Sequence, residues 1–139
     1  MARRTFVDTS GWYALIDRRD TWHTVAKAEV ESLVAAGGRL VTTDYVVDEA
    51  CTLTKARAGA HAAIRLLDLL RQTTGVTWEW VTSDRFARAE ALFRKQRDQA
   101  YSFTDCTSFA IMRETRLDRA LTSDEHFRIA GFTPLLVAR

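Results

Sequence analysis

Residues 5–12 read TFVDTSGW and residues 116–127 read RLDRALTSDEHF, and these two stretches decide the fold. In each, a short run of β-branched or apolar residues stops at an aspartate, Asp8 in the first and Asp124 in the second. The carboxyl ends of parallel strands meet at one edge of an α/β sheet, where such folds bind their ligands. We therefore expect Asp8 and Asp124 to lie close together at that edge.

Two further acids fall on predicted helices. Glu49 shares helical spacing with Val46 and Leu53, which predicts a carboxylate inside an apolar stripe, where an unpartnered charge is costly. Asp105 leads a second stripe that continues with Phe109. A capping box, S-x-x-D over residues 102–105, explains Asp105 equally well.

Asp8 and Asp124 each have an ordinary explanation taken alone, since an aspartate between a strand and a helix is most often an N-cap. Gathered at one edge, the four would repel, by about 4 kcal/mol for a pair about 4 Å apart at an effective dielectric near 20. Several such pairs rival the whole stability of a small domain, about 5–15 kcal/mol. A hard divalent cation resolves the conflict, and carboxylates with water are what Mg²⁺ or Mn²⁺ prefers.

The rest of the chain alternates strands and helices, which predicts an α/β fold with a mostly parallel sheet. Its 139 residues are expected to form a single domain over residues 1–139. Pro134 opens the last strand and cannot donate to a ladder, so that strand is expected at a sheet edge. Strands are expected at residues 5–7, 40–43, 77–81, 120–122 and 135–137. Helices are expected at residues 12–16, from about 21, at 44–58, 60–72, around 86–93, and at 103–115.

Composition excludes several classes. No apolar run approaches the roughly 20 residues that span a bilayer, and the N-terminus has no apolar secretory segment, which predicts a cytoplasmic protein. Cys51 and Cys106 are expected to be reduced and buried. The histidines at positions 23, 61 and 126 show no metal-ligand spacing and are expected to be ordinary solvated or core-edge residues.

The net charge is +2, and basic residues concentrate at residues 55–71 and 85–97. An acidic pocket elsewhere would leave this basic excess free to lie along a phosphate backbone, although a solvated helix face explains any single residue equally well.

Four segments together resemble a known family. FVDTS at 6–10, TTDYVVDE at 42–49, SFTDC at 102–106 and LTSDEHF at 121–127 are similar, in order, to the four acidic motifs of PIN-domain ribonucleases. The greatest similarity is to VapC-type toxins of bacterial toxin–antitoxin pairs, and it covers Phe6 to Leu136. The resemblance implies a three-layer PIN-like fold with sheet order 3-2-1-4-5 and Mg²⁺- or Mn²⁺-dependent hydrolysis of RNA, such as tRNA or another structured RNA. It also implies a small antitoxin partner and a homodimer.

The resemblance also implies roles for named residues. Asp8 and Asp105 would bind the cation directly, Asp124 directly or through water, and Glu49 would orient a water or complete the coordination shell. Thr9 or Ser10 would position water or phosphate.

Other functions stay open from the sequence. A non-catalytic PIN-like module could bind RNA or a protein partner with the same fold. A response-regulator receiver would need an acidic pair after the first strand and a lysine after the last, yet no lysine follows Lys95. An aspartyl-phosphate phosphatase would need D-x-D where this chain has Asp8-Thr9-Ser10.

Overall fold

The computed structural model describes residues 3–138, and its centre is a five-stranded sheet. The order is β3-β2-β1-β4-β5, and all four pairings are parallel, which confirms the predicted order and α/β class. The strands are β1 Arg4–Val7, β2 Arg39–Thr43, β3 Val76–Glu79, β4 Arg119–Leu121 and β5 Thr133–Pro134.

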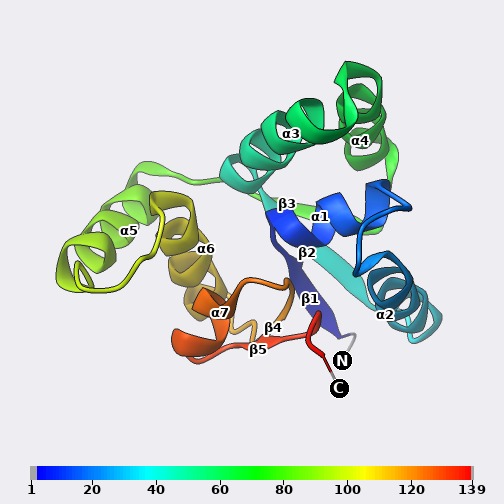
Figure 1. The fold of residues 1–139 in the computed structure, drawn as a ribbon. Coiled ribbons are helices and arrows are strands. Elements are labelled where there is room, and N and C mark those ends of the chain that lie inside the picture. The colour runs from blue at the N-terminus through cyan, green and yellow to red at the C-terminus, as the bar shows by residue number, and fades with distance from the viewer. Residues whose placement is uncertain (1–2, 139) are drawn as a thin grey trace.

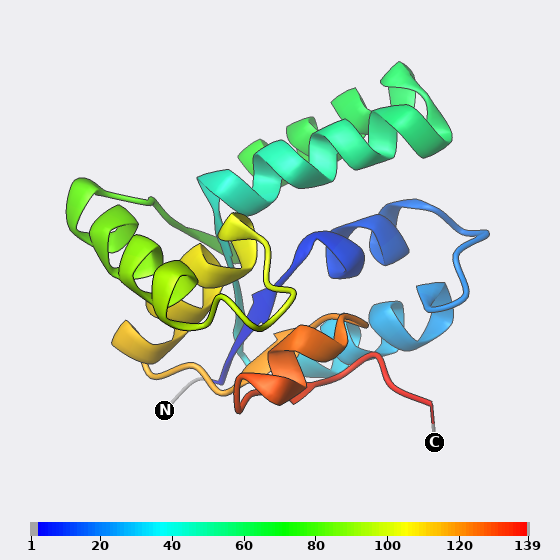
Figure 2. The same ribbon diagram turned by 60° about the vertical axis from the view of Figure 1, so that its left-hand side comes forward.

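Helices lie on both sides of this sheet, as parallel crossovers require. Helices α1 and α2 lie on one side and α5 and α6 on the other, while α3 and α4 form a pair beyond the end of the sheet (Figures 1 and 2). The helices are α1 Thr9–Ile16, α2 His23–Ala35, α3 Asp44–Ala58, α4 Ala60–Gln72, α5 Ser83–Lys95, α6 Phe103–Glu114 and α7 Glu125–Ile129.

The central strands are apolar because both of their faces are covered. Phe6, Val7 and Leu121 are buried, and Phe6 packs on Phe127 of α7 with ring centroids 6.3 Å apart. Phe127 in turn meets Phe109 of α6 edge to face at 5.0 Å. This aromatic contact fixes α6 and α7 relative to β1, and therefore fixes the acids that these helices carry.

The register of β1 on β4 determines where the acids fall. Val7 pairs with Leu121, and the next residue, Asp8, donates its backbone N–H to Leu121 O at 3.2 Å. A Cβ at Gly11 would lie 2.2 Å from that same carbonyl oxygen, so only glycine lets the first turn of α1 approach β4 this closely. Asp8 is thereby held beside the end of β4.

Two predicted strands had a boundary that was wrong by two residues or more, and the other three differ by one residue at most. The third strand ends at Glu79, two residues early, because Val81 N turns to donate to Asp44 Oδ1 at 2.8 Å. The last strand is Thr133–Pro134 rather than residues 135–137. It does lie at the sheet edge, as Pro134 predicted, and Leu135 N still donates to Ala120 O at 2.9 Å.

Two smaller expectations concern the cysteines and the membrane. Both cysteines are free as predicted; Cys106 is buried, but Cys51 is only half-buried. Among residues 3–138, no helix has the length and apolar character needed to cross a membrane.

Candidate active site

Asp8 ends β1 and precedes α1, yet its carboxylate does not cap that helix. It is almost fully buried and accepts a hydrogen bond from Thr122 Oγ1 at 3.0 Å. The pKa of Asp8 is raised to about 7: burial is the largest cause, the nearby carboxylates of Asp105 and Asp124 add to the rise, and hydrogen bonds oppose it. A group held this far from its ordinary value, in a polar pocket, is typical of a functional site.

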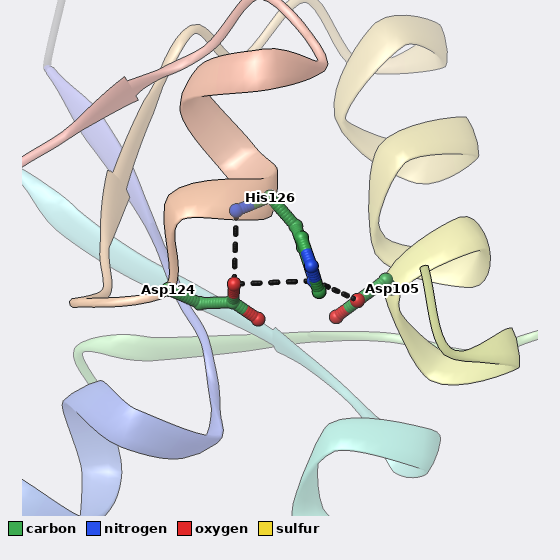
Figure 3. Close-up of side chains that lie close together, drawn as sticks. All are labelled: Asp105, Asp124 and His126. Atoms are coloured by element: carbon green, nitrogen blue, oxygen red, sulfur yellow. Dashed lines mark hydrogen bonds and ion pairs between the residues drawn. The ribbon is translucent and has the colours of Figure 1, made fainter. Parts of the chain in front are cut away.

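Asp105, Asp124 and His126 form a cluster whose ligand atoms all lie within 4.8 Å of one another (Figure 3). His126 Nδ1 lies 3.1 Å from Asp105 Oδ2 and 3.2 Å from Asp124 Oδ1, so the imidazole bridges the two carboxylates. Two carboxylates at this separation suit a hard divalent cation.

The capping roles considered for these acids are also present. Ser102 and Asp105 form the full capping box of α6, with Ser102 N donating to Asp105 Oδ2 at 3.1 Å. Asp124 caps α7 by accepting from His126 N at 2.9 Å. Within residues 3–138, the hydrogen bonds of Asp105 use Oδ2 alone and those of Asp124 use Oδ1 alone. Capping therefore leaves the second oxygen of each carboxylate available to a cation.

His126 was expected to be an ordinary solvated or core-edge residue; it is half-buried, and its ring contacts two of the acids. It follows Asp124 by two residues, in the first turn of α7, and its ring turns back towards Asp105 beside the ring of Tyr101 at 5.5 Å. The local sequence signal for this contact is the Asp-x-His spacing at residues 124–126.

Glu49 corrects a prediction. It was expected inside the apolar stripe of α3, but it is exposed, and the buried side of that helix carries Val46, Val47 and Ala50. Its Oε1 accepts a hydrogen bond from Thr9 Oγ1 at 2.6 Å, which ties α3 to the start of α1. Glu49 therefore stands at the rim of the acidic pocket rather than in the core.

A chain of hydroxyls joins the two strand ends. Ser123 N donates to Ser10 Oγ at 3.0 Å, and Ser10 Oγ lies 3.1 Å from Thr122 Oγ1. Thr122 is fully buried, and its hydroxyl accepts from Asp124 N at 3.0 Å while it donates to Asp8. Because that single proton goes to Asp8, Ser10 is the donor to Thr122, and every link of the chain runs towards the Asp8 carboxylate.

The acids open onto a pocket of about 310 Å³ whose lining includes Asp8, Glu49 and Asp124. Asp105 does not line the pocket, but a carboxylate oxygen of Asp105 lies within 4.8 Å of one of Asp124, which does. The structure thus brings the predicted acids to one edge of the sheet, together with Thr9 and Ser10. The crowding of carboxylates around a buried Asp8 fits a hard cation that would offset their repulsion.

The basic residues have more varied positions than the sequence suggested. Arg85 pairs with Glu79 at 3.0 Å and with Glu114 at 2.5 Å, and Arg88 pairs with Glu114 at 2.7 Å. These ion pairs join α5 to β3 and α6. Arg85 is therefore held within the fold, whereas Arg88 remains exposed beside Glu114.

Known proteins resemble this chain over most of its length. Residues 5–132 match the family model described as PIN domain. The chain is 36% identical over 127 residues to the 23S rRNA-specific endonuclease VapC20 of Mycobacterium tuberculosis strain CDC 1551 / Oshkosh, and the match covers 91% of this chain and 94% of the relative. The protein of that name from strain ATCC 25618 / H37Rv matches with the same values.

A solved structure of a protein with the same name also matches this chain. The crystal structure of VapC20 from Mycobacterium tuberculosis, described as a sarcin–ricin loop cleaving toxin, matches with a TM-score of 0.83 and 35% identity. The match covers 93% of this chain and 96% of that chain. The chain therefore belongs to the PIN domain family, among the VapC endonucleases.

Proposed function

We propose that this chain is a Mg²⁺- or Mn²⁺-dependent endoribonuclease and the toxin of a type II toxin–antitoxin pair. The observation that carries the proposal is the cluster of Asp105, Asp124 and His126 beside buried Asp8, at the carboxyl edge of the sheet. The substrate we propose is the sarcin–ricin loop of 23S rRNA, because the relatives are named for that RNA. This substrate replaces tRNA, which the sequence alone suggested as one structured RNA.

Asp8, Asp105 and Asp124 would hold the cation, with Glu49 completing the shell directly or through water. When bound, the cation lowers the pKa of water and offsets the negative charge that builds up on the phosphate. The second oxygens of Asp105 and Asp124 are the ones that capping leaves for this purpose.

The other residues position these acids. Thr122 fixes one oxygen of Asp8 through its hydrogen bond, and Ser10 fixes the hydroxyl of Thr122. Thr9 holds Glu49 at the rim of the pocket. His126 holds the carboxylates of Asp105 and Asp124 at a set separation, which limits their movement when the phosphate arrives.

The test is cleavage of a synthetic sarcin–ricin loop RNA by the purified chain. EDTA should abolish cleavage and added Mg²⁺ or Mn²⁺ should restore it. Asp8→Asn should be inactive, whereas Asp48→Asn, which removes an exposed acid from α3, should retain activity. Full cleavage by metal-free protein would end the proposal. Binding without cleavage, with the metals present, would instead favour the non-catalytic RNA-binding module.

We further propose that residues 1–139 act as one domain in the cytoplasm and form a homodimer that a small antitoxin covers. Exposed apolar side chains support a covered surface, since Ile64 on α4 is 59% exposed and Trp80 after β3 is 52% exposed. Light scattering of the chain alone and with the product of an adjacent small gene tests both partners. A monomer at high concentration, with no such gene, would contradict this part.

A further inference from the structure

The pocket in front of the acids has a second end that the proposed chemistry does not use. Along α3, Glu49, Leu53 and Arg57 are four residues apart, so they form one row on the helix surface, and all three line the pocket. Thr9 and Tyr13 of α1 form the facing row, also four residues apart. The pocket therefore runs along the two helices from Glu49 to Arg57, and the carboxylate of Asp20 also lines it.

Two contacts hold these rows together. At one end Thr9 donates to Glu49 at 2.6 Å. At the other end the guanidinium carbon of Arg57 lies over the ring of Tyr13, 5.3 Å from its centroid. Tyr13 is buried, and its hydroxyl donates to Asp17 Oδ2 at 2.6 Å, so the ring that supports Arg57 is itself fixed.

Arg57 is exposed, and among residues 3–138 no carboxylate forms an ion pair with it. Among these described residues it is also the one Lys or Arg in the lining of this pocket, whose other charged members are carboxylates. A guanidinium held over an aromatic ring can still offer N–H donors to a planar, bidentate partner. An unpaired arginine in this setting favours an anionic ligand that arrives from solution.

We propose that Arg57 binds a phosphate of the RNA backbone that flanks the scissile phosphate, and that the bound strand follows the row on α3. Eight residues of helix separate Glu49 from Arg57, a rise of about 12 Å, which is too far for both to reach the same phosphate. The carboxylates of the pocket repel the backbone, and the flanking contact offsets that repulsion. The inference rests on the proposed function, because it assigns a subsite of the same pocket.

The experiment measures binding of a fluorescent sarcin–ricin loop RNA in EDTA, where no cleavage is expected, at NaCl concentrations from 50 to 200 mM. Arg57→Gln should bind roughly five- to tenfold more weakly at 50 mM NaCl, as expected for loss of a charge-assisted contact. It should also lower the steepness of log affinity against log salt by about 0.7, the value for one single-strand phosphate contact. The ratio of affinities between the two proteins then shrinks about 2.6-fold over this salt range.

Two variants make the comparison specific. Lys55→Gln removes an equal charge from the same last turn of α3 and is the matched control, because Lys55 does not line the pocket. Arg57→Lys keeps the charge and should retain the salt dependence, with intermediate affinity because it loses the planar, bidentate guanidinium. In Mn²⁺, Arg57→Gln should raise KM at nearly unchanged kcat, and its Mn²⁺-induced rise in Tm should equal that of the unaltered chain.

The inference is overturned if Arg57→Gln and Lys55→Gln behave alike, whether both weaken binding or neither does. Failure of the unaltered chain to cut RNA in Mn²⁺ would instead end the proposed function. The salt dependence of binding would then still decide whether Arg57 contacts a phosphate.

Discussion

Replacement of Asp8 by asparagine tests how much the buried negative charge of Asp8 lowers the stability of the metal-free chain. In the folded chain the pKa of Asp8 is raised from 3.8 to about 7, with burial as the main cause. Asparagine keeps the size of the side chain and an oxygen that can accept from Thr122, but it carries no charge. In EDTA, Asp8→Asn should therefore be more stable than the unaltered chain at neutral pH.

The magnitude follows from the two pKa values. One pKa unit corresponds to about 1.36 kcal/mol, so ionised Asp8 lowers the free energy of unfolding by about 4 kcal/mol at pH 8. At pH 5 the carboxyl is protonated in the folded state and ionised in the unfolded state, and the cost is about 2 kcal/mol. Because the folded-state pKa is the higher one, stability falls as pH rises from about 4 to about 7. The stability advantage of Asp8→Asn should therefore grow by about 2–3 kcal/mol between pH 5 and pH 8.

Urea unfolding in EDTA from pH 5 to pH 8 measures this difference, with Asp48→Asn as the control for loss of an exposed acid. Addition of Mn²⁺ should then raise the Tm of the unaltered chain and leave that of Asp8→Asn nearly unchanged. The reasoning is refuted if Asp8→Asn is less stable than the unaltered chain at pH 8. A stability difference that does not vary with pH would refute it as well.

Three other predictions concern the same edge of the sheet. Thr122→Val should destabilise the chain by about 1–3 kcal/mol, because Asp8 loses a hydrogen-bond donor. The same variant should bind Mn²⁺ more weakly in a calorimetric titration. Thr122→Ser, which keeps the hydroxyl, should retain most of the stability and most of the Mn²⁺ affinity. Gly11→Ala should cost about 1–3 kcal/mol in urea unfolding, since its Cβ would lie 2.2 Å from Leu121 O, whereas Gly75→Ala, with its nearest side-chain atom at 4.0 Å, should be nearly neutral. Mass spectrometry of the RNA fragments should find 5′-phosphate and 3′-hydroxyl ends from attack by water. Cyclic-phosphate ends would show attack by the 2′-hydroxyl, with His126 as the candidate base.

The sequence predicted those parts of the fold that depend on neighbouring residues or on strand order. Asp8 follows β1 directly and Asp124 lies three residues after β4 ends, so their shared edge needed only the parallel topology. The bounds of α3 and α4 were predicted correctly because Gly59, with a φ of 94°, separates two clear helical periods. The roles of the acids in catalysis stay predictions, since geometry alone does not test them.

What the sequence did not predict depends on how separate elements pack. The helical wheel of α3 places Glu49 near the apolar stripe, but the wheel cannot show that Thr9 of α1 meets its carboxylate at the rim. His126 joins the acids only because α7 turns its ring towards the start of α6. The contact between Arg57 and the ring of Tyr13 likewise depends on how α1 packs on α3. No sequence pattern within either helix predicts that packing.

The acidic site is held in shape by bonds that do not involve a cation. Asp105 is held by Ser102, Asp124 by the first turn of α7 and Asp8 by Thr122, so each carboxylate already has a fixed orientation. The cost of this arrangement is charge repulsion and burial, which the raised pKa of Asp8 records. A divalent cation would remove that cost without rearranging the side chains, and so its binding energy would appear as stability. This is why Asp8→Asn is expected to stabilise the metal-free chain and to abolish the response to Mn²⁺, an opposition that a purely structural capping role would not produce.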